Sequence, residues 1–201
     1  ANVINAVKLK KTPTKIVHIS TDHVYDRIGL SSESNINLVN TYARTKFLGE
    51  QVCTAPRSLI IRTNFFGKSK LPGRKSLSDW IIEKLEAGEK VRAFNDVYFN
   101  PLSIETLVKL IKISVIKDLK GIYNVSSKNG LSKYDFAKTL AKEMNYNPNQ
   151  IESISIDQHL NLGAKRPKGM MMDCTKFEAA TNLSMPELAV EIKIAANGYQ
   201  L

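Results

Sequence analysis

The sequence predicts an α/β protein with a mostly parallel sheet, and three observations carry this prediction. Two short apolar runs, residues 15–20 and 57–63, each end in polar residues. Near-continuous apolar runs of this length are typical of parallel strands that are covered on both faces. The segment between them has the residue spacing of a helix, and further strand-like and helix-like segments alternate after it. A right-handed strand–helix–strand crossover is therefore the expected building unit.

The first half of the chain contains three expected helices. Residues 2–9 have helical character, so the sequence starts inside an element rather than with a strand. The helix between the two predicted strands covers residues 41–52, and Thr41 has the hydroxyl of an N-cap residue. An amphipathic helix over residues 77–90 should stop near Gly88, because glycine accepts the left-handed conformation that ends many helices.

The second half continues the alternation of helices and strands. The expected elements are a helix at 103–117, a buried strand at 121–126, a helix at 132–145, an edge strand at 151–156 and a last helix at 186–200. Ser103 and Ser132 stand where a side-chain oxygen can accept an unpaired backbone N–H at a helix start. Asn197 and Gly198 are expected to close the last helix.

Composition argues against several classes of protein. No apolar run approaches the roughly 20 residues that cross a bilayer, and the first residues lack the layout of a cleavable signal. We therefore expect a cytoplasmic protein with no membrane partner. Cys53 and Cys174 are too few for a disulfide framework, and neither has metal-ligand spacing. Reduced thiols and no metal site are expected.

The formal net charge of +10 has two explanations, a nucleic acid or an anionic small molecule. The lysines are spread along the whole chain, and no nucleic-acid-binding signature occurs, so no nucleic-acid partner is expected. The densest basic cluster, residues 67–76, lies in a loop marked by glycine and proline. It could contact a phosphate or form a solvated surface.

Residues 20–50 contain groups suited to proton transfer during hydride transfer. A phenol has an unperturbed pKa of about 10, and a neighbouring ammonium lowers that pKa by favouring the phenolate. Tyr42 and Lys46 are four residues apart, so on a helix they share one face. Thr21 follows the first predicted strand, at the carboxyl end where open α/β sheets bind ligands. Its hydroxyl could orient a substrate oxygen.

The spacing of Tyr42 and Lys46 is not sufficient by itself. Tyr134 and Lys138 have the same spacing, but Tyr134 falls on an apolar helical stripe and is better interpreted as a packing residue. The strand-ending Thr21 distinguishes the first pair from the second. The alternative is a helix that happens to carry a tyrosine and a lysine.

Six segments, taken in order, extend the pattern over nearly the whole chain. They are ISTDHVYD (19–26), YARTKFLGE (42–50), LIIRTNFFG (59–67), NDVYFNPLSIETL (95–107), GIYNVSSKNGLSKYDFAKTLA (121–141) and AKRPKGMMMDCTKFE (164–178). Together they resemble the dTDP-4-dehydrorhamnose reductase family of the extended short-chain dehydrogenase/reductase superfamily. Matches in sequence order carry far more weight than a lone tyrosine–lysine pair.

The resemblance implies a Rossmann-like parallel sheet with a smaller α+β part that binds the substrate. It assigns residues 1–64 and 103–126 to the C-terminal part of the dinucleotide-binding domain. It assigns residues 65–102 and 127–201 to the part that binds a sugar nucleotide. The implied reaction is reduction of the 4-keto group of a nucleotide-linked deoxysugar by NADPH or NADH. A homodimer is one assembly to expect.

The resemblance also implies roles for individual residues. Tyr42 would be the general acid, Lys46 would also hydrogen-bond the nicotinamide ribose, and Thr21 would complete the catalytic set. Ser20 and Thr63 would contact the cofactor. The residues implied for substrate binding are Asp22, His23, Asn64, Phe65 and Arg166. Arg166 could grip a diphosphate or only occupy a surface loop, whereas Asp22 and Asp26, which flank His23, fit loop capping better than a metal site.

The sequence departs from the family at its start. The family's glycine-rich turn, which cradles a pyrophosphate at a helix N-terminus, is absent. The resemblance therefore implies an N-terminally incomplete sheet, and the chain alone should bind NAD(P)H weakly.

Three substitutions leave the particular sugar open. Phe65 stands where the family usually has tryptophan, and His23 replaces an aromatic residue. Asn64 is similar to the asparagine with which sugar-nucleotide epimerases and dehydratases contact a nucleotide phosphate. The alternatives are a sugar-nucleotide 4-epimerase or dehydratase with the same catalytic residues, and a non-catalytic regulatory or binding homologue.

Overall fold

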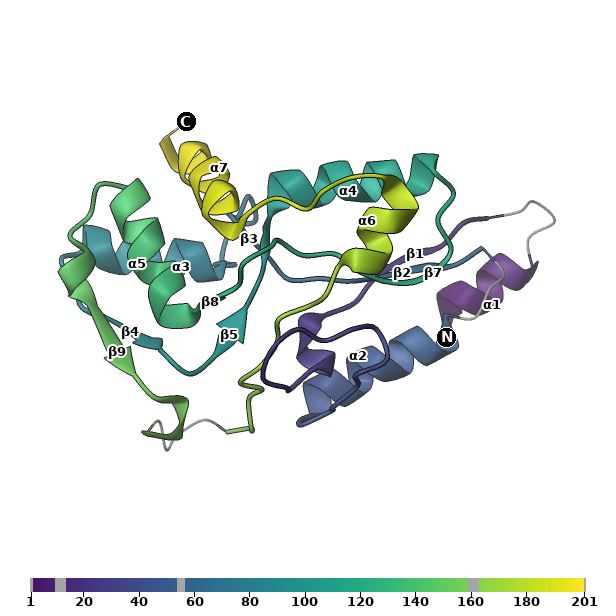
Figure 1. Ribbon diagram of the computed structural model, residues 1–201, viewed down its shortest axis with the longest axis horizontal. Helices are drawn as coiled ribbons and strands as arrows, with labels where there is room; N and C mark the ends of the chain where they lie inside the picture. Colours follow the sequence, from purple (N-terminus) through teal and green to yellow (C-terminus); the bar gives the residue numbers. More distant parts are fainter. Residues whose placement is uncertain (1, 10–13, 54–56, 159–162, 201) are drawn as a thin grey trace.

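Three parallel strands form the larger sheet of the protein. The computed structural model describes residues 2–9, 14–53, 57–158 and 163–200 (Figure 1). The strands are β1 (Val17–Ile19), β2 (Leu59–Arg62) and β7 (Gly121–Asn124), in the order β1-β2-β7. β2 pairs with both neighbours, so its carboxyl end lies between theirs.

Helices cover both faces of this sheet. In Figure 1, α4 (Ile104–Ile116) and α6 (Thr175–Thr181) lie above the sheet, and α1 (Asn2–Leu9) and α2 (Thr41–Val52) lie below it. This layering is that of an α/β protein, as the sequence predicts. None of the helices within the described residues is long and apolar enough to cross a membrane.

β2 is buried along its whole length, and its side chains alternate between the two helical layers. Leu59 and Ile61 pack with Leu107 of α4 and Phe177 of α6. Ile60 belongs to a separate cluster on the side of α1. The unbroken apolar run in the sequence therefore reflects burial on two faces.

A second apolar core lies beside the sheet. It is built from α3 (Leu77–Glu86), α5 (Lys133–Glu143), α7 (Leu188–Gln200) and the parallel pair β4 (Val91–Phe94) and β9 (Ile151–Ile154). At its centre, buried aromatic rings pack edge to face, with ring centroids 4.8 Å and 5.2 Å apart.

Short elements connect the two cores and the loops. They are β3 (Phe65–Phe66) parallel to β6 (Leu102–Ser103), β5 (Tyr98–Phe99) antiparallel to β8 (Leu131–Ser132), and the single turns η1 (Asp22–Val24), η2 (Pro148–Gln150) and η3 (Ile156–Gln158). Each strand in these pairs contributes two residues, so their pairing depends on the surrounding core.

Most predicted helix boundaries are confirmed. Ser103 and Ser132 cap α4 and α5 through their side chains. Gly88, with φ of 70°, follows the C-cap of α3. The predicted cap of α2 is wrong, because Thr41 is already helical. Asn40 takes the cap position in extended conformation and accepts the backbone N–H of Ala43 at 2.8 Å.

The predicted end of the last helix is also wrong. α7 continues through Asn197 and Gly198 to Gln200. The reason is a tertiary anchor beyond the glycine, since the Tyr199 hydroxyl donates to Asp79 of α3 at 2.6 Å. A contact made after Gly198 holds the final turn in place.

A buried ion pair joins α2 to β2. Glu50 is 2% exposed and Arg62 is 1% exposed, and the Arg62 Nη2 lies 2.6 Å from Glu50 Oε2. Arg62 Nε donates to the same carboxylate at 3.0 Å and 3.1 Å. The Ser20 hydroxyl also donates to it. The carboxylate thus fixes α2 against the ends of β1 and β2.

Removing one partner of this pair should destabilise the fold strongly. We expect Arg62→Met to lower the free energy of unfolding by about 3–5 kcal/mol, because Glu50 would remain buried without its cation. Urea denaturation measures this change. As a matched control, Lys75→Met breaks an exposed pair with Glu83 and should cost no more than about 1 kcal/mol. A loss for Arg62→Met as small as that of the control would contradict the assigned role.

Candidate active site

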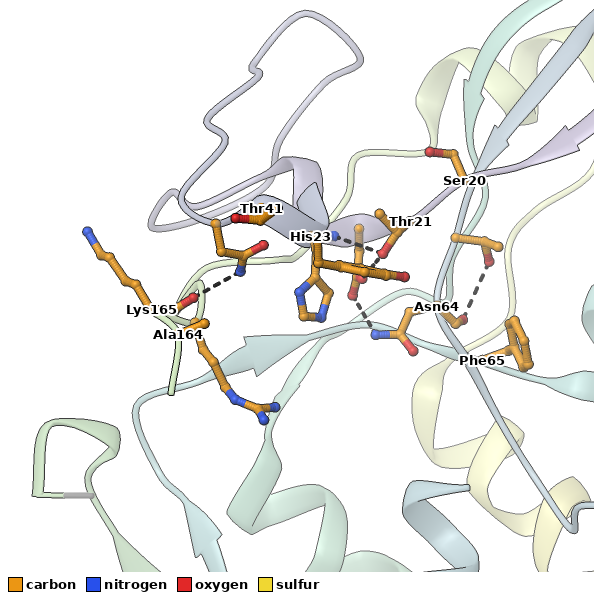
Figure 2. A pocket seen from close by; sticks show the side chains of 13 residues that line it. Ser20, Thr21, His23, Thr41, Asn64, Phe65, Ala164 and Lys165 are labelled. Carbon is orange, nitrogen blue, oxygen red and sulfur yellow. Dashed lines mark hydrogen bonds between the residues drawn. The ribbon is translucent and has the colours of Figure 1, made fainter. Parts of the chain in front are cut away.

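The carboxyl ends of β1 and β2 open into a cavity of about 530 Å³. Figure 2 draws the side chains of the 13 residues that line it. They come from four segments that are distant in sequence, residues 20–23, 40–42, 63–65 and 164–166. The parallel sheet thus places the predicted site at its ligand-binding edge.

Ser20 and Thr21 follow β1 directly, and both are 5% exposed. The Ser20 backbone N–H donates to the Ile61 carbonyl at 2.7 Å, which keeps the strand end aligned with β2. Thr21 caps η1, because its hydroxyl oxygen accepts the His23 N–H at 3.2 Å. The same hydroxyl donates to the Asp22 carboxylate at 3.2 Å (Figure 2).

A hydrogen bond between Asn64 and Asp22 connects the two strand ends. Asn64 Nδ2 donates to Asp22 Oδ2 at 2.5 Å (Figure 2). Asp22 is 1% exposed, and this burial raises its pKa, although the positive charges of His23 and Lys133 partly oppose the shift. Asp22 therefore fixes the orientation of the Asn64 amide at the cavity wall.

Tyr42 and His23 meet at the entrance of the cavity. Their rings pack edge to face with centroids 5.3 Å apart. Tyr42 is 53% exposed, so it lines the cavity while remaining open to solvent. Burial lowers the pKa of His23, and the charge of Asp22 opposes this shift.

Lys46 is the one predicted site residue that does not line the cavity. It lies one turn after Tyr42 on α2, as its spacing predicts, and its ammonium donates to the carbonyl oxygen of Ile19 at 2.9 Å. The ammonium is therefore held at the end of β1, next to Ser20 and Thr21, which line the cavity.

The wall that carries Arg166 is fastened to the rest of the site at two points. Asn40 Nδ2 donates to the Lys165 carbonyl at 2.9 Å (Figure 2). Asp26 Oδ1 accepts the backbone N–H groups of Lys168 and Gly169 at 2.8 Å and 3.3 Å. The loop-capping role expected for Asp26 is confirmed, and Arg166 is an exposed residue of the cavity wall.

The chemistry of a metal or disulfide site is not found among the described residues. No group of three His, Cys, Asp or Glu side chains in that part of the chain could hold a metal ion. Cys53 and Cys174 are both buried free thiols. Burial raises the pKa of Cys174 to about 12, so it is a protonated core residue.

The cavity fits one end of a nicotinamide cofactor better than the other. Ser20, Tyr42 and Thr63 bring hydroxyl groups to its lining, and these groups suit a nicotinamide and its ribose. The sequence contains no glycine-rich turn for the pyrophosphate. The residues present therefore fit the reacting end of NAD(P)H only.

Sequence reasoning missed the residues that support the site. Two sequence features point weakly to the Glu50–Arg62 ion pair. Glu50 stands one turn after Lys46, and Arg62 is a charged residue at the end of an apolar strand.

A family model described as RmlD substrate binding domain matches residues 3–200. Three relatives match over most of the chain. The spore coat polysaccharide biosynthesis protein SpsK of Bacillus subtilis is 26% identical over 69% of this chain and 49% of its own length. The dTDP-4-dehydrorhamnose reductase of Sinorhizobium fredii is 24% identical over 85% and 62%, respectively. The methionine adenosyltransferase 2 subunit beta of Rattus norvegicus is 24% identical over 81% and 51%. The chain thus spans only part of the length of each of these relatives.

Solved structures share the architecture. The dTDP-4-dehydrorhamnose reductase of Bacillus anthracis in complex with NADP has a TM-score of 0.83 at 25% identity, covering 90% of this chain and 65% of that chain. A dTDP-4-dehydrorhamnose reductase of Clostridium acetobutylicum has a TM-score of 0.88 at 21% identity, covering 100% and 70%. At 21% identity the similarity shows the fold alone.

The packing of Gly169 predicts a sensitive point in the segment that follows Arg166. A Cβ atom at Gly169 would lie 1.8 Å from the carbonyl oxygen of Arg27. We expect Gly169→Ala to cost on the order of 3 kcal/mol in unfolding free energy, because two backbone segments must separate. Gly163→Ala is the control, since nothing lies within 4 Å of its Cβ position. Equal stability of the two variants in urea denaturation would show that the loop yields without cost.

Proposed function

The chain belongs to the RmlD substrate binding domain family, and from this premise we propose that it is the substrate-side part of an NADPH- or NADH-dependent reductase. The proposed reaction reduces the 4-keto group of a nucleotide-linked deoxysugar to an alcohol. The observation that carries the proposal is the cavity that brings Thr21 and Tyr42 together at the carboxyl ends of two parallel strands.

We propose that residues 1–64 and 103–126 belong to the cofactor-binding part and residues 65–102 and 127–201 to the sugar-nucleotide-binding part. The second apolar core supports this division, because its members come almost entirely from the latter ranges. Leu102, Cys174, Phe177 and Met185 are exceptions in packing, since they join the core of the larger sheet.

In the proposed mechanism, Tyr42 donates its phenolic proton to the substrate oxygen as the carbonyl carbon is reduced. NAD(P)H supplies the hydride when bound. Thr21 offers a hydroxyl at the same strand end to orient that oxygen. Lys46 places a positive charge one helical turn from Tyr42, which favours the phenolate that proton donation leaves behind. Its bond to the Ile19 carbonyl supports this placement.

The remaining lining residues are assigned to the two ligands. We assign Ser20 and Thr63 to the cofactor side. The substrate side would use Asp22, His23, Asn64, Phe65 and Arg166. The free thiols support a reducing, cytoplasmic location. A homodimer remains a prediction.

A non-catalytic binding role is the second candidate, favoured by the similarity to a methionine adenosyltransferase subunit. Such a protein would bind a nucleotide without reducing it. A sugar-nucleotide 4-epimerase or dehydratase is a third candidate function, and Asn64 at the cavity wall supports it.

Replacing the phenol tests the proposed acid. In the protein of which this chain is the substrate-side part, Tyr42→Phe should lower the rate of NAD(P)H oxidation with a 4-keto sugar nucleotide by roughly 10²–10⁴-fold. Tyr134→Phe is the matched control, because Tyr134 has the same spacing to a lysine but packs against the second core. An unchanged rate in Tyr42→Phe would remove the acid role. Conversion of the sugar without net NAD(P)H oxidation would instead indicate an epimerase or dehydratase. Binding without turnover would indicate the non-catalytic binding role.

A further inference from the structure

A second cavity, of about 800 Å³, lies between the start of α4, the end of α7 and the loop at residues 67–76. Figure 1 shows α7 beside the start of α4, and a hydrogen bond between Thr106 and Glu191 joins the two helices. Phe65 lines both this cavity and the active-site cavity. Sites for small organic ligands typically have volumes of about 300–1,000 Å³, so the second cavity has the size of a binding site.

Part of the cavity lining is apolar and open to solvent. Ile104 and Val108 stand one turn apart on α4 and are 37% and 58% exposed, and Phe65 is 50% exposed. Ala195 of α7 is buried in the same lining. A ligand that filled the cavity would remove this apolar surface from water, which is favourable.

The serine hydroxyl groups in the lining are already engaged within the protein. Ser103 accepts the Thr106 N–H at 3.2 Å and donates to the Thr106 hydroxyl at 3.0 Å. Ser76 accepts the Asp79 N–H at 3.1 Å, and Ser69 accepts a backbone N–H of its own loop at 3.3 Å. A nucleobase or a sugar needs free hydrogen-bond partners. The lining therefore suits a hydrocarbon better than either of these groups.

The loop at residues 67–76 is anchored to the start of α3. The Gly67 N–H donates to the Ser78 hydroxyl at 3.0 Å, and the Ser76 N–H donates to the Asp79 carboxylate at 2.7 Å. The sequence leaves this basic cluster as either a phosphate contact or a solvated surface. The anchoring holds the loop at the edge of the second cavity, where four of its cations join the lining.

Cations outnumber carboxylates around this cavity. The charged lining residues are Lys68, Lys70, Arg74, Lys75 and Lys109, with one carboxylate, Glu105. Of these cations, only Lys75 takes part in an ion pair among the described residues, and its partner is Glu83. Lys68 and Arg74 also line a smaller cavity together with the acidic side chains of α3. Lys70 and Lys109 are therefore the cations that we assign to the second cavity.

Gly198 in the last turn of α7 leaves part of this cavity open. Glycine inside a helix is destabilising relative to alanine. A Cβ atom at Gly198 would have Glu105 Oε1 as its nearest neighbour, at 3.7 Å, which is an ordinary contact. Packing within the protein therefore does not require glycine at this position. Both residues line the cavity, so a larger side chain at position 198 would occupy its space.

We propose that the second cavity binds an amphipathic anion, in which a hydrocarbon body carries a phosphate or diphosphate group. The body covers Ile104, Val108 and Phe65. The anionic group is bound by Lys70 of the loop and Lys109 of α4, because charge-assisted hydrogen bonds to phosphate are stronger than neutral ones. This site takes a ligand of a different class from the sugar nucleotide of the proposed function and does not depend on that function.

Calorimetric titration of the chain with geranyl diphosphate tests the proposal. We expect saturable binding with one site per chain, and an affinity that falls as salt is added. Geraniol has the hydrocarbon body alone and inorganic diphosphate has the anionic group alone. Each of them should bind at least about tenfold more weakly than geranyl diphosphate, because each makes only one of the two kinds of contact.

Two pairs of variants locate the site. The double variant Lys70→Met, Lys109→Met should weaken binding of geranyl diphosphate on the order of tenfold. Its control is Lys193→Met, because Lys193 is exposed on α7 outside the cavity lining. Gly198→Leu should fill the cavity and weaken binding at least about tenfold, whereas Gly198→Ala should retain it. Both replacements at Gly198 favour the helix, and thermal unfolding verifies that they are folded.

Several results would overturn the proposal. They are no binding of geranyl diphosphate, equally tight binding of inorganic diphosphate, wild-type affinity in Gly198→Leu, and an equal loss in Lys193→Met. Sedimentation velocity provides a further check. A dimer that Gly198→Leu dissociates and geranyl diphosphate leaves intact would assign the cavity to a second copy of the chain. The probe has no keto group and no nucleotide, so failure of the Tyr42→Phe test would refute the proposed reduction and leave this inference standing.

Discussion

The ion pair between Glu50 and Arg62 determines where the candidate active site lies. α2 presents little apolar surface to the sheet, and its buried residues are Ala43 and Glu50. The helix that carries Tyr42 is therefore positioned largely by polar contacts, with Glu50 held by Arg62 and Lys46 held by a strand carbonyl. Buried charges tolerate little displacement, because a partner left alone loses its compensation. The ion pair therefore holds α2, and with it the Tyr42 phenol, in one position.

The same network extends from β2 to β7 behind the cavity. Arg62 Nη1 donates to the Tyr25 hydroxyl at 2.9 Å, and that hydroxyl donates to Asn124 Oδ1 at 2.6 Å. Burial raises the pKa of Tyr25 to about 12, so it remains a donor at all physiological pH values. Asn124 Nδ2 in turn donates a hydrogen bond to the carbonyl oxygen of Asp173 at 3.2 Å. A chain of hydrogen bonds therefore links the ends of all three parallel strands.

Local signals explain which parts of the fold could be predicted. Ser103 and Ser132 identify helix starts because capping involves residues three apart in sequence. The choice between Asn40 and Thr41 could not be made, since both have capping side chains and only the backbone conformation decides. The contact of Lys46 with the Ile19 carbonyl was equally hidden, because helical spacing shows a shared face but not the partner across it.

The segments that line the cavity differ in chemistry. The sheet side contributes Tyr42 on α2 and the strand-end Thr21, which are groups for proton transfer. The loop at residues 164–166 contributes Arg166, an exposed cation of the cavity wall. Asp22 also lines the cavity, and its burial raises its pKa. A ligand with a neutral reacting group and an anionic tail complements this arrangement, because each of its ends meets the side that can stabilise it.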